Sequence, residues 1–230
     1  MLIFTQMLIL FNFYWFLLNK ILYFWLNIKT KKAMKNLFKN IALIAVSIFV
    51  LSCSDDDNNS NEPQTIADIA SANPNLSILV QALDRAGLVA TFDGTGDFTV
   101  FAPTNTAFNN FLATTPYATI NDVPVPVLTE ILKNHVIGAS YTSSELTTGY
   151  VKTLAKGSAS STNTLSMYID LTSGVKINGG STNGGANVVL TSANIAASNG
   201  VIHVVDNVIG LPTVVNHAIA NPSFATLTTL

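Results

Sequence analysis

The side chains best suited to acid–base or metal chemistry are few in this sequence and far apart. The three histidines, His135, His203 and His217, fall in separate segments, whereas the ligands of a metal site recur at short, regular spacings. The motifs G-x-S-x-G, H-E-x-x-H and C-x-x-C, which mark common hydrolases, metalloproteases and redox proteins, are absent. We therefore expect no catalytic centre, no bound metal and no organic cofactor.

The clearest chemical assignment belongs to Cys53, the only cysteine in the sequence. A basic start at Met34 and the apolar run from Ile41 to Leu51 are the two parts of a bacterial secretory signal. Val50-Leu51-Ser52-Cys53 resembles a lipobox, in which signal peptidase cuts before a cysteine that receives diacylglycerol. We expect residues 34–52 to be a lipoprotein signal peptide and Cys53 to be lipidated.

The segments on either side of this signal carry further expectations. Residues 53–64 are polar and predict a disordered tether, because nothing in them can pack against a core. Ser54 and the three acids that follow it resemble the signal that exports lipoproteins to the cell surface in Bacteroidetes. Residues 1–33 could span a bilayer, but a complete signal begins after them. We therefore favour the interpretation that residues 1–33 result from a start codon assigned too far upstream, and a transmembrane segment is the alternative. For the processed protein we predict an outer-membrane lipoprotein exposed at the cell surface.

The distribution of charge excludes two classes of partner. All 13 acidic residues, but only five of the 11 basic ones, follow Cys53, so the processed chain is strongly acidic. Clustered Lys or Arg is missing from it, which argues against nucleic acid and against anionic membrane surfaces as partners. Membrane contact is expected only through the lipid anchor.

The elements that must position a binding surface are organised around Phe98–Phe108. The start of this stretch predicts a strand that is apolar on both faces, and Pro103 ends the strand because proline supplies no ladder donor. Thr104 or Asn105 then caps a short helix, in which Phe108 begins an i, i+3, i+4 apolar face. A strand followed at once by a helix that packs back on it is the predicted centre of the fold.

The rest of the chain predicts helices first and strands later. The predicted helices are 65–87, broken at Pro74, and a second one that follows Pro124 and ends near His135. His135 falls on the inward, apolar face of the second helix, where we favour a structural role over a ligand role. The predicted strands are 165–171, 175–178, 188–190, 195–197 and 201–205. His203 lies within the last strand, where we expect a buried ring whose nitrogens are satisfied by neighbouring backbone.

Two stretches together resemble the signatures of the fasciclin domain, an extracellular adhesion-type module. The first consists of Phe98, Thr99, Val100, Phe101, Ala102, Pro103, Thr104, Asn105, Ala107 and Phe108, and the second contains Gly200, Val201, Ile202, His203, Val204 and Asp206. The resemblance covers residues 65–212. It implies an α+β, fasciclin-like fold, a compact β-sheet wedge or sandwich with several short helices packed against it.

The resemblance also implies where a partner would bind. Fasciclin domains often carry a Tyr-His pair, linked to adhesion in animal members, at the place of Asn134-His135. The implied binding surface is made of Asn134, His135, Tyr141, Ser143 and Ser144. We expect a non-catalytic adhesion or interaction module whose partner is an extracellular protein or polysaccharide. A glycan-binding lipoprotein and a structural spacer are the alternatives.

Residues 213–222, T-V-V-N-H-A-I-A-N-P, repeat residues 65–74, T-I-A-D-I-A-S-A-N-P. Further on, Leu227 takes the place of Leu79. A repeat at the period of a whole domain predicts a tandem array. We expect residues 213–230 to be the start of a second fasciclin domain, which either docks on the first or stays loose because it lacks its own core.

Overall fold

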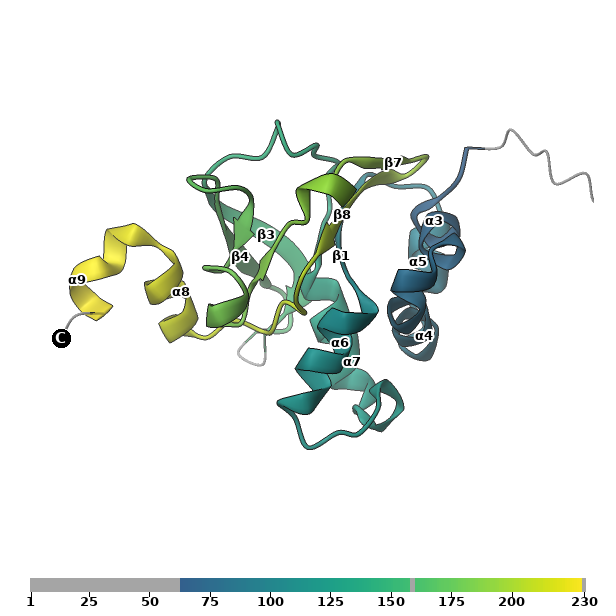
Figure 1. Ribbon diagram of the computed structural model, residues 1–230, viewed down its shortest axis with the longest axis horizontal. Coiled ribbons are helices and arrows are strands. Elements are labelled where there is room, and N and C mark those ends of the chain that lie inside the picture. The colour runs from purple at the N-terminus through teal and green to yellow at the C-terminus, as the bar shows by residue number, and fades with distance from the viewer. Residues whose placement is uncertain (1–62, 158–159, 229–230) are drawn as a thin grey trace, which may run out of the picture. The chain divides into compact units, whose positions relative to one another are not determined.

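Figure 1 shows the computed structural model, which describes residues 63–157 and 160–228. The predicted signal peptide, the lipidation site at Cys53 and the tether up to residue 62 lie outside the described residues. Short helices and two four-stranded sheets make up the described part. The α+β class predicted from the sequence is confirmed.

The first sheet places the two sequence motifs side by side. Its order is β2-β1-β8-β7, with β1 at Phe98–Pro103, β2 at Val136–Ile137, β7 at Ile195–Ala197 and β8 at Gly200–Val205. Strands β1 and β8 are parallel and stay in register from Phe98 opposite Gly200 to Pro103 opposite Val205. Apart from the half-buried Phe98, both strands are buried, because a central parallel pair is covered on both faces.

Gly200 is required where β1 and β8 meet. Its φ is 149°, and a Cβ atom added there would lie 2.0 Å from the carbonyl oxygen of Phe98. Any larger residue would push the two strands apart, because that atom belongs to the backbone and cannot move aside. Asn199-Gly200 also ends the turn between the antiparallel strands β7 and β8.

The second sheet is wholly antiparallel and differs in part from the prediction. Its order is β3-β4-β5-β6, with β3 at Gly149–Lys156, β4 at Thr164–Asp170, β5 at Lys176–Ile177 and β6 at Ala186–Asn187. The sequence reading missed β3. The predicted strand at 188–190 is wrong, because Val188 makes only an isolated bridge to Val205 and Leu190 begins a 3-10 turn with its side chain 65% exposed.

Two groups of helices pack against the sheets: the first lies on the face of the first sheet opposite the second sheet, and the second lies below the strands, where its last helix also contacts β3 (Figure 1). The first group is α3 (Ile66–Ala72), η2 (Pro74–Leu76), α4 (Ser77–Arg85) and α5 (Val89–Asp93), and the second is α6 (Asn105–Ala113), η3 (Ile120–Asp122) and α7 (Val125–Asn134). The predicted break at Pro74 and the predicted cap at Thr104 are both confirmed. Thr104 Oγ1 accepts the amide of Ala107 at 3.2 Å.

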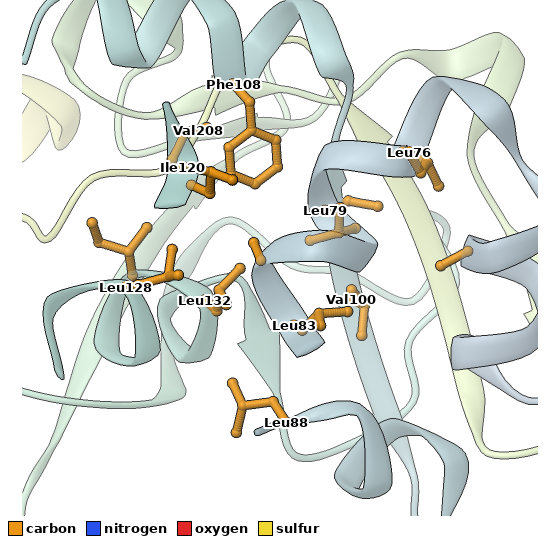
Figure 2. Packing of buried hydrophobic residues seen from close by; sticks show 14 of the residues in the cluster. Leu76, Leu79, Leu83, Leu88, Val100, Phe108, Ile120, Leu128, Leu132 and Val208 are labelled. Atoms are coloured by element: carbon orange, nitrogen blue, oxygen red, sulfur yellow. The ribbon is translucent and has the colours of Figure 1, made fainter. Parts of the chain in front are cut away.

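The alternation of side chains along β1 divides the interior into two clusters. Val100 and Ala102 join Ile202 and the helix residues in one cluster, part of which Figure 2 shows at close range. Phe101 points to the other face and packs with residues of the second sheet such as Met167. Successive side chains of a strand point to opposite faces, so a single strand serves both clusters.

The chain ends in α8 (Val214–Ala220), η6 (Pro222–Phe224) and α9 (Ala225–Thr228), the yellow end of Figure 1. These elements reproduce the local structure of α3, η2 and the start of α4. Thr65 and Thr213 both form capping boxes, and Asn73 and Asn221 end the first helix of each segment with nearly equal backbone angles, φ −99°, ψ 111° and φ −100°, ψ 115°. The repeat seen in the sequence is therefore also a repeat in structure.

Candidate functional site

Asn134 and His135 lie at the end of α7 and point into the domain, with side chains 0% and 2% exposed. Asn134 Nδ2 donates to the Gly210 carbonyl at 2.9 Å, and Thr153 Oγ1 donates to Asn134 Oδ1 at 3.3 Å. The prediction that this pair contributes to an exposed binding surface is wrong, whereas the inward position expected for His135 is confirmed. The helix ends with both side chains turned inward, where they join α7 to β3 and to the segment after β8.

The His135 ring is held by two backbone groups. Nδ1 lies 2.7 Å from the Ile131 carbonyl, and the amide of Ile209 donates to Nε2 at 2.8 Å. An acceptor at Nε2 and a donor at Nδ1 define a neutral ring with its proton on Nδ1. Burial lowers the pKa of His135 to about 4, although the bond to Ile131 opposes this shift. His135 is thus a neutral structural residue at ordinary pH.

His203 plays a similar part in β8, as the sequence predicted. Nε2 lies 2.9 Å from the Tyr141 carbonyl, and the Asn194 amide donates to Nδ1 at 3.2 Å. The ring stacks on Phe101 with centroids 5.7 Å apart. Burial lowers the pKa of His203, which keeps Nδ1 free to accept.

Thr99 contributes from the neighbouring strand to the same place. Its hydroxyl donates to the Ala139 carbonyl at 2.6 Å and accepts the Tyr141 amide at 2.8 Å. Both motifs therefore direct a buried polar side chain, Thr99 from β1 and His203 from β8, to the backbone around Tyr141. We call residues 139–145 the anchored loop.

The rest of the anchored loop is fixed by its own polar residues. Ser143 and Asn194 bond twice, from the Ser143 amide to Asn194 Oδ1 at 2.7 Å and from Asn194 Nδ2 to Ser143 Oγ at 2.9 Å. Glu145 accepts the Thr142 amide at 2.7 Å, and this bond is the main reason that the pKa of Glu145 is lowered. The loop is held along its length while Ser144 stays exposed.

The structure therefore splits the predicted binding surface. Tyr141 and Ser143 are half-buried in the anchored loop, and Ser144 is exposed beside them, so these three residues lie together. Sequence reasoning missed Thr99 and Asn194 as the residues that hold the loop. A threonine inside an otherwise apolar strand was the available signal for Thr99, whereas Asn194, at φ 58°, gave none.

The other polar residues of the two motifs also have structural roles. Asn105 Oδ1 accepts the Ile78 amide at 2.9 Å, so it joins α6 to α4 rather than capping its own helix. Asp206 accepts the Asn187 amide at 2.7 Å. These contacts hold distant segments together, and nothing in them resembles a reacting pair.

A metal-binding cluster is missing from the described part of the chain, and the cavity beside the first sheet is small. No group of three His, Cys, Asp or Glu within residues 63–157 and 160–228 could hold a metal ion. The enclosed cavity between α3, α4 and the first sheet measures about 20 Å³ and is lined almost wholly by apolar side chains, so it could hold no more than a water-sized guest. None of the helices described is long and apolar enough to cross a bilayer.

Comparison with known proteins places this geometry in a family. The family model for the Fasciclin domain matches residues 74–212. Protein sll1483 of Synechocystis sp. is 36% identical over 155 residues, which cover 65% of this chain and 75% of that protein. An uncharacterized protein of the same organism, sll1735, is 35% identical over 146 residues, 63% of this chain and 96% of its own.

Two further similarities concern proteins of the cell surface. Cell surface glycolipoprotein MPB83 of Mycobacterium bovis is 40% identical over 88 residues, 35% of this chain and 38% of that protein. A FAS1 domain pair from the insect cell adhesion molecule Fasciclin I shares the fold, with a TM-score of 0.50 at 18% identity. The match covers 66% of this chain and about half of the insect chain, 52%. More than half of the sequence matches the family model, so this chain belongs to the fasciclin domain family.

Proposed function

We propose that this chain is a surface-anchored adhesion or interaction module that binds an extracellular protein or polysaccharide through the anchored loop, without catalysis. The observation that most supports this proposal is that Thr99 and His203, from two strands, both hydrogen-bond to the backbone of that loop. A loop that is already ordered loses little conformational entropy when a partner binds. Two relatives whose names refer to cell adhesion and the cell surface support the same reading.

The binding face that we propose extends from the anchored loop to its neighbour at residues 190–194. Ser140, Ser144 and Glu145 expose polar groups on the first, and Leu190 exposes an apolar side chain on the second. The Ser143–Asn194 pair joins the two segments. A mixed surface of this kind suits a glycan or a protein surface, and tandem or densely displayed copies would raise weak single contacts to useful avidity.

Attachment of clustered protein tests this proposal. The full chain, immobilised densely on beads, is expected to bind cell-envelope fractions or extracellular polysaccharide, whereas the soluble monomer binds weakly. Ser144→Arg should reduce attachment several-fold and leave the melting temperature unchanged, because Ser144 is exposed. Ser71→Arg, on the exposed side of α3, is the matched control and should bind as the parent does. An equal loss of attachment in both variants would contradict the proposal, and so would turnover of a substrate by the monomer. If the parent protein shows no attachment at all, a structural spacer is the better interpretation.

The membrane anchor needs a separate test, because Cys53 lies outside the described residues. We propose that Cys53 carries the lipid. Cys53→Ser should therefore move the protein from the membrane fraction to the soluble fraction. If the variant stays in the membrane and the mature protein begins at Met1, residues 1–33 are the anchor instead.

A further inference from the structure

His203 holds both segments of the proposed binding face through the two nitrogens of one ring. Nε2 contacts the Tyr141 carbonyl of the anchored loop, and the Asn194 amide, from the neighbouring segment 190–194, donates to Nδ1. A carbonyl only accepts and a backbone amide only donates, so Nε2 carries the proton and Nδ1 carries none. The face therefore requires the neutral form of this ring.

A second proton on the ring is incompatible with this arrangement. The proton would bind Nδ1, and the N–H groups of His203 and Asn194 would then face each other across 3.2 Å. The His203 side chain is 0% exposed, so the charged ring cannot be solvated where it lies. Protonation must therefore displace either the ring or the Asn194 backbone.

The surroundings of His203 do not stabilise its charged form. The segments around the ring are the anchored loop, with Tyr141 and Glu145 as its titratable side chains, and β1, β7 and residues 190–194, which contain none. The carboxylate of Asp206, just after β8, binds across to β6. Within residues 63–157 and 160–228, His203 forms no ion pair. Burial lowers the pKa of His203, although the bond to Tyr141 opposes this shift.

Asn194 links the ring to the anchored loop. The residue whose amide donates to His203 also bonds twice with Ser143 through its side chain. Its φ of 58° is left-handed, so a displaced Asn194 backbone relaxes to a more common conformation. Thr99 holds the Tyr141 amide by a hydroxyl that does not titrate. Movement that starts at Asn194 is thus confined to the part of the loop beyond Tyr141.

We propose that His203 is a pH-sensitive switch in the binding face. The neutral ring holds residues 190–194 against the anchored loop, and a proton on Nδ1 releases Asn194 and, with it, Ser143. This inference rests on the proposed function, since it concerns the same face, and it adds a regulation: attachment is strong at neutral pH and weak in acid.

The direction of the effect follows from the two states of the ring. The released ring has the ordinary histidine pKa of about 6.5, whereas the pKa of the held ring is lowered by burial. Below about pH 6.5 the released state binds the proton and the held state does not. Each further pH unit favours release by up to about tenfold, until the pKa of the held ring is reached.

Amide hydrogen exchange of the full chain tests the switch without a partner. After correction for the effect of pH on intrinsic exchange, protection of the Ser143 and Asn194 amides should fall by up to about tenfold between pH 7.0 and 5.5. The Tyr141 amide should keep its protection, which distinguishes local release from general unfolding in acid. In His203→Gln, which does not titrate, Ser143 should be equally protected at both pH values. Constant protection of Ser143 in the parent would overturn the switch.

Asn194→Gly provides a second test that leaves the ring in place. Glycine accepts the positive φ and keeps the amide that contacts His203, but it removes the side chain that binds Ser143. The Ser143 amide should then exchange quickly at both pH values, while the amide of residue 194 still loses protection in acid. A Ser143 amide that remains protected only at pH 7.0 in this variant would show that Asn194 is not the link.

Attachment to cell-envelope fractions separates the switch from the proposed function. Beads that carry the parent should lose attachment several-fold at pH 5.5 relative to pH 7.0, whereas His203→Gln should attach equally at both and Asn194→Gly weakly at both. Parent attachment that is equal at the two pH values, although Ser143 loses protection, would overturn the regulation of binding. If nothing attaches at pH 7.0 but protection still falls in acid, the switch is supported and the proposed function is contradicted.

Discussion

The two copies of the repeat have the same local structure and opposite burial. Residues 65–80 form α3, η2 and the start of α4, and their apolar side chains fill the core. Residues 213–228 form α8, η6 and α9 with equivalent caps, yet they contact the domain through amides and expose their apolar residues. The comparison teaches that caps and breaks determine helix ends, whereas the available neighbours determine which face is buried.

The largest expected difference between the copies is the cost of removing an equivalent leucine. Leu79→Ala should lower the free energy of unfolding by about 3 kcal/mol, because it leaves a cavity in the core. Leu227→Ala should change it by less than about 0.5 kcal/mol, because the side chain is 62% exposed. Urea unfolding of both variants measures this, and equal losses would show that the two copies are buried alike.

Acid should lower the stability of the fold through His135, which lies beside the first copy of the repeat. His135 lines the cavity beside Ile66 and Leu79, and its pKa is about 4 in the folded protein against about 6.5 when unfolded. Its stabilising effect is complete above pH 6.5 and is lost as the pH falls towards 4, because only the unfolded chain binds the proton in that range. Between pH 6.5 and pH 4, the free energy of unfolding should therefore fall by about 3 kcal/mol.

Urea unfolding at several pH values checks this dependence. His217, in the second copy, is only partly buried, so His217→Gln should retain most of the loss in acid. A stability that is constant between pH 6.5 and 4 would contradict the neutral, buried state of His135.

The residue that fastens the first copy should matter more than its counterpart. Asn199 Oδ1 accepts the Ile66 amide at 2.9 Å, and its Nδ2 donates to the carbonyls of Phe92 and Gly94, both at 2.8 Å. Asn199→Ala should cost about 2 kcal/mol, because it leaves buried backbone groups without partners. Thermal unfolding measures the loss of stability, and Asn75→Ala, at an exposed position, is the control. If both variants lose the same stability, Asn199 does not hold the first copy in place.

The smallest expected effect belongs to Asn183, which fastens the second copy. Asn183→Ala should lower the free energy of unfolding by less than about 1 kcal/mol, because the contact lies near the surface. It should nevertheless speed amide hydrogen exchange in α8 while leaving exchange in α3 unchanged. Unaltered exchange in α8 would show that other contacts hold the segment.

Much of the fold could be predicted because its signals are local. The strand that ends at Pro103, the helix that Thr104 caps and the break at Pro74 each depend on residues within one turn of chain. The buried state of His203 followed from the apolar strand around it. By contrast β3 was missed, because its exposed and buried residues alternate incompletely and its register shifts between Lys152 and Lys156.

The sequence by itself determined the family, the cap at the start of α6, most of the strands and the existence of the repeat, because these depend on near neighbours and on long motifs. Only the tertiary structure decided that Asn134 is buried, that Thr99 and Asn194 hold the anchored loop and that the second copy turns its apolar face outward. Each of these depends on contacts between segments far apart in the chain. Residue type and spacing specify what a side chain can bond to, but only the packed neighbours determine which partner it meets.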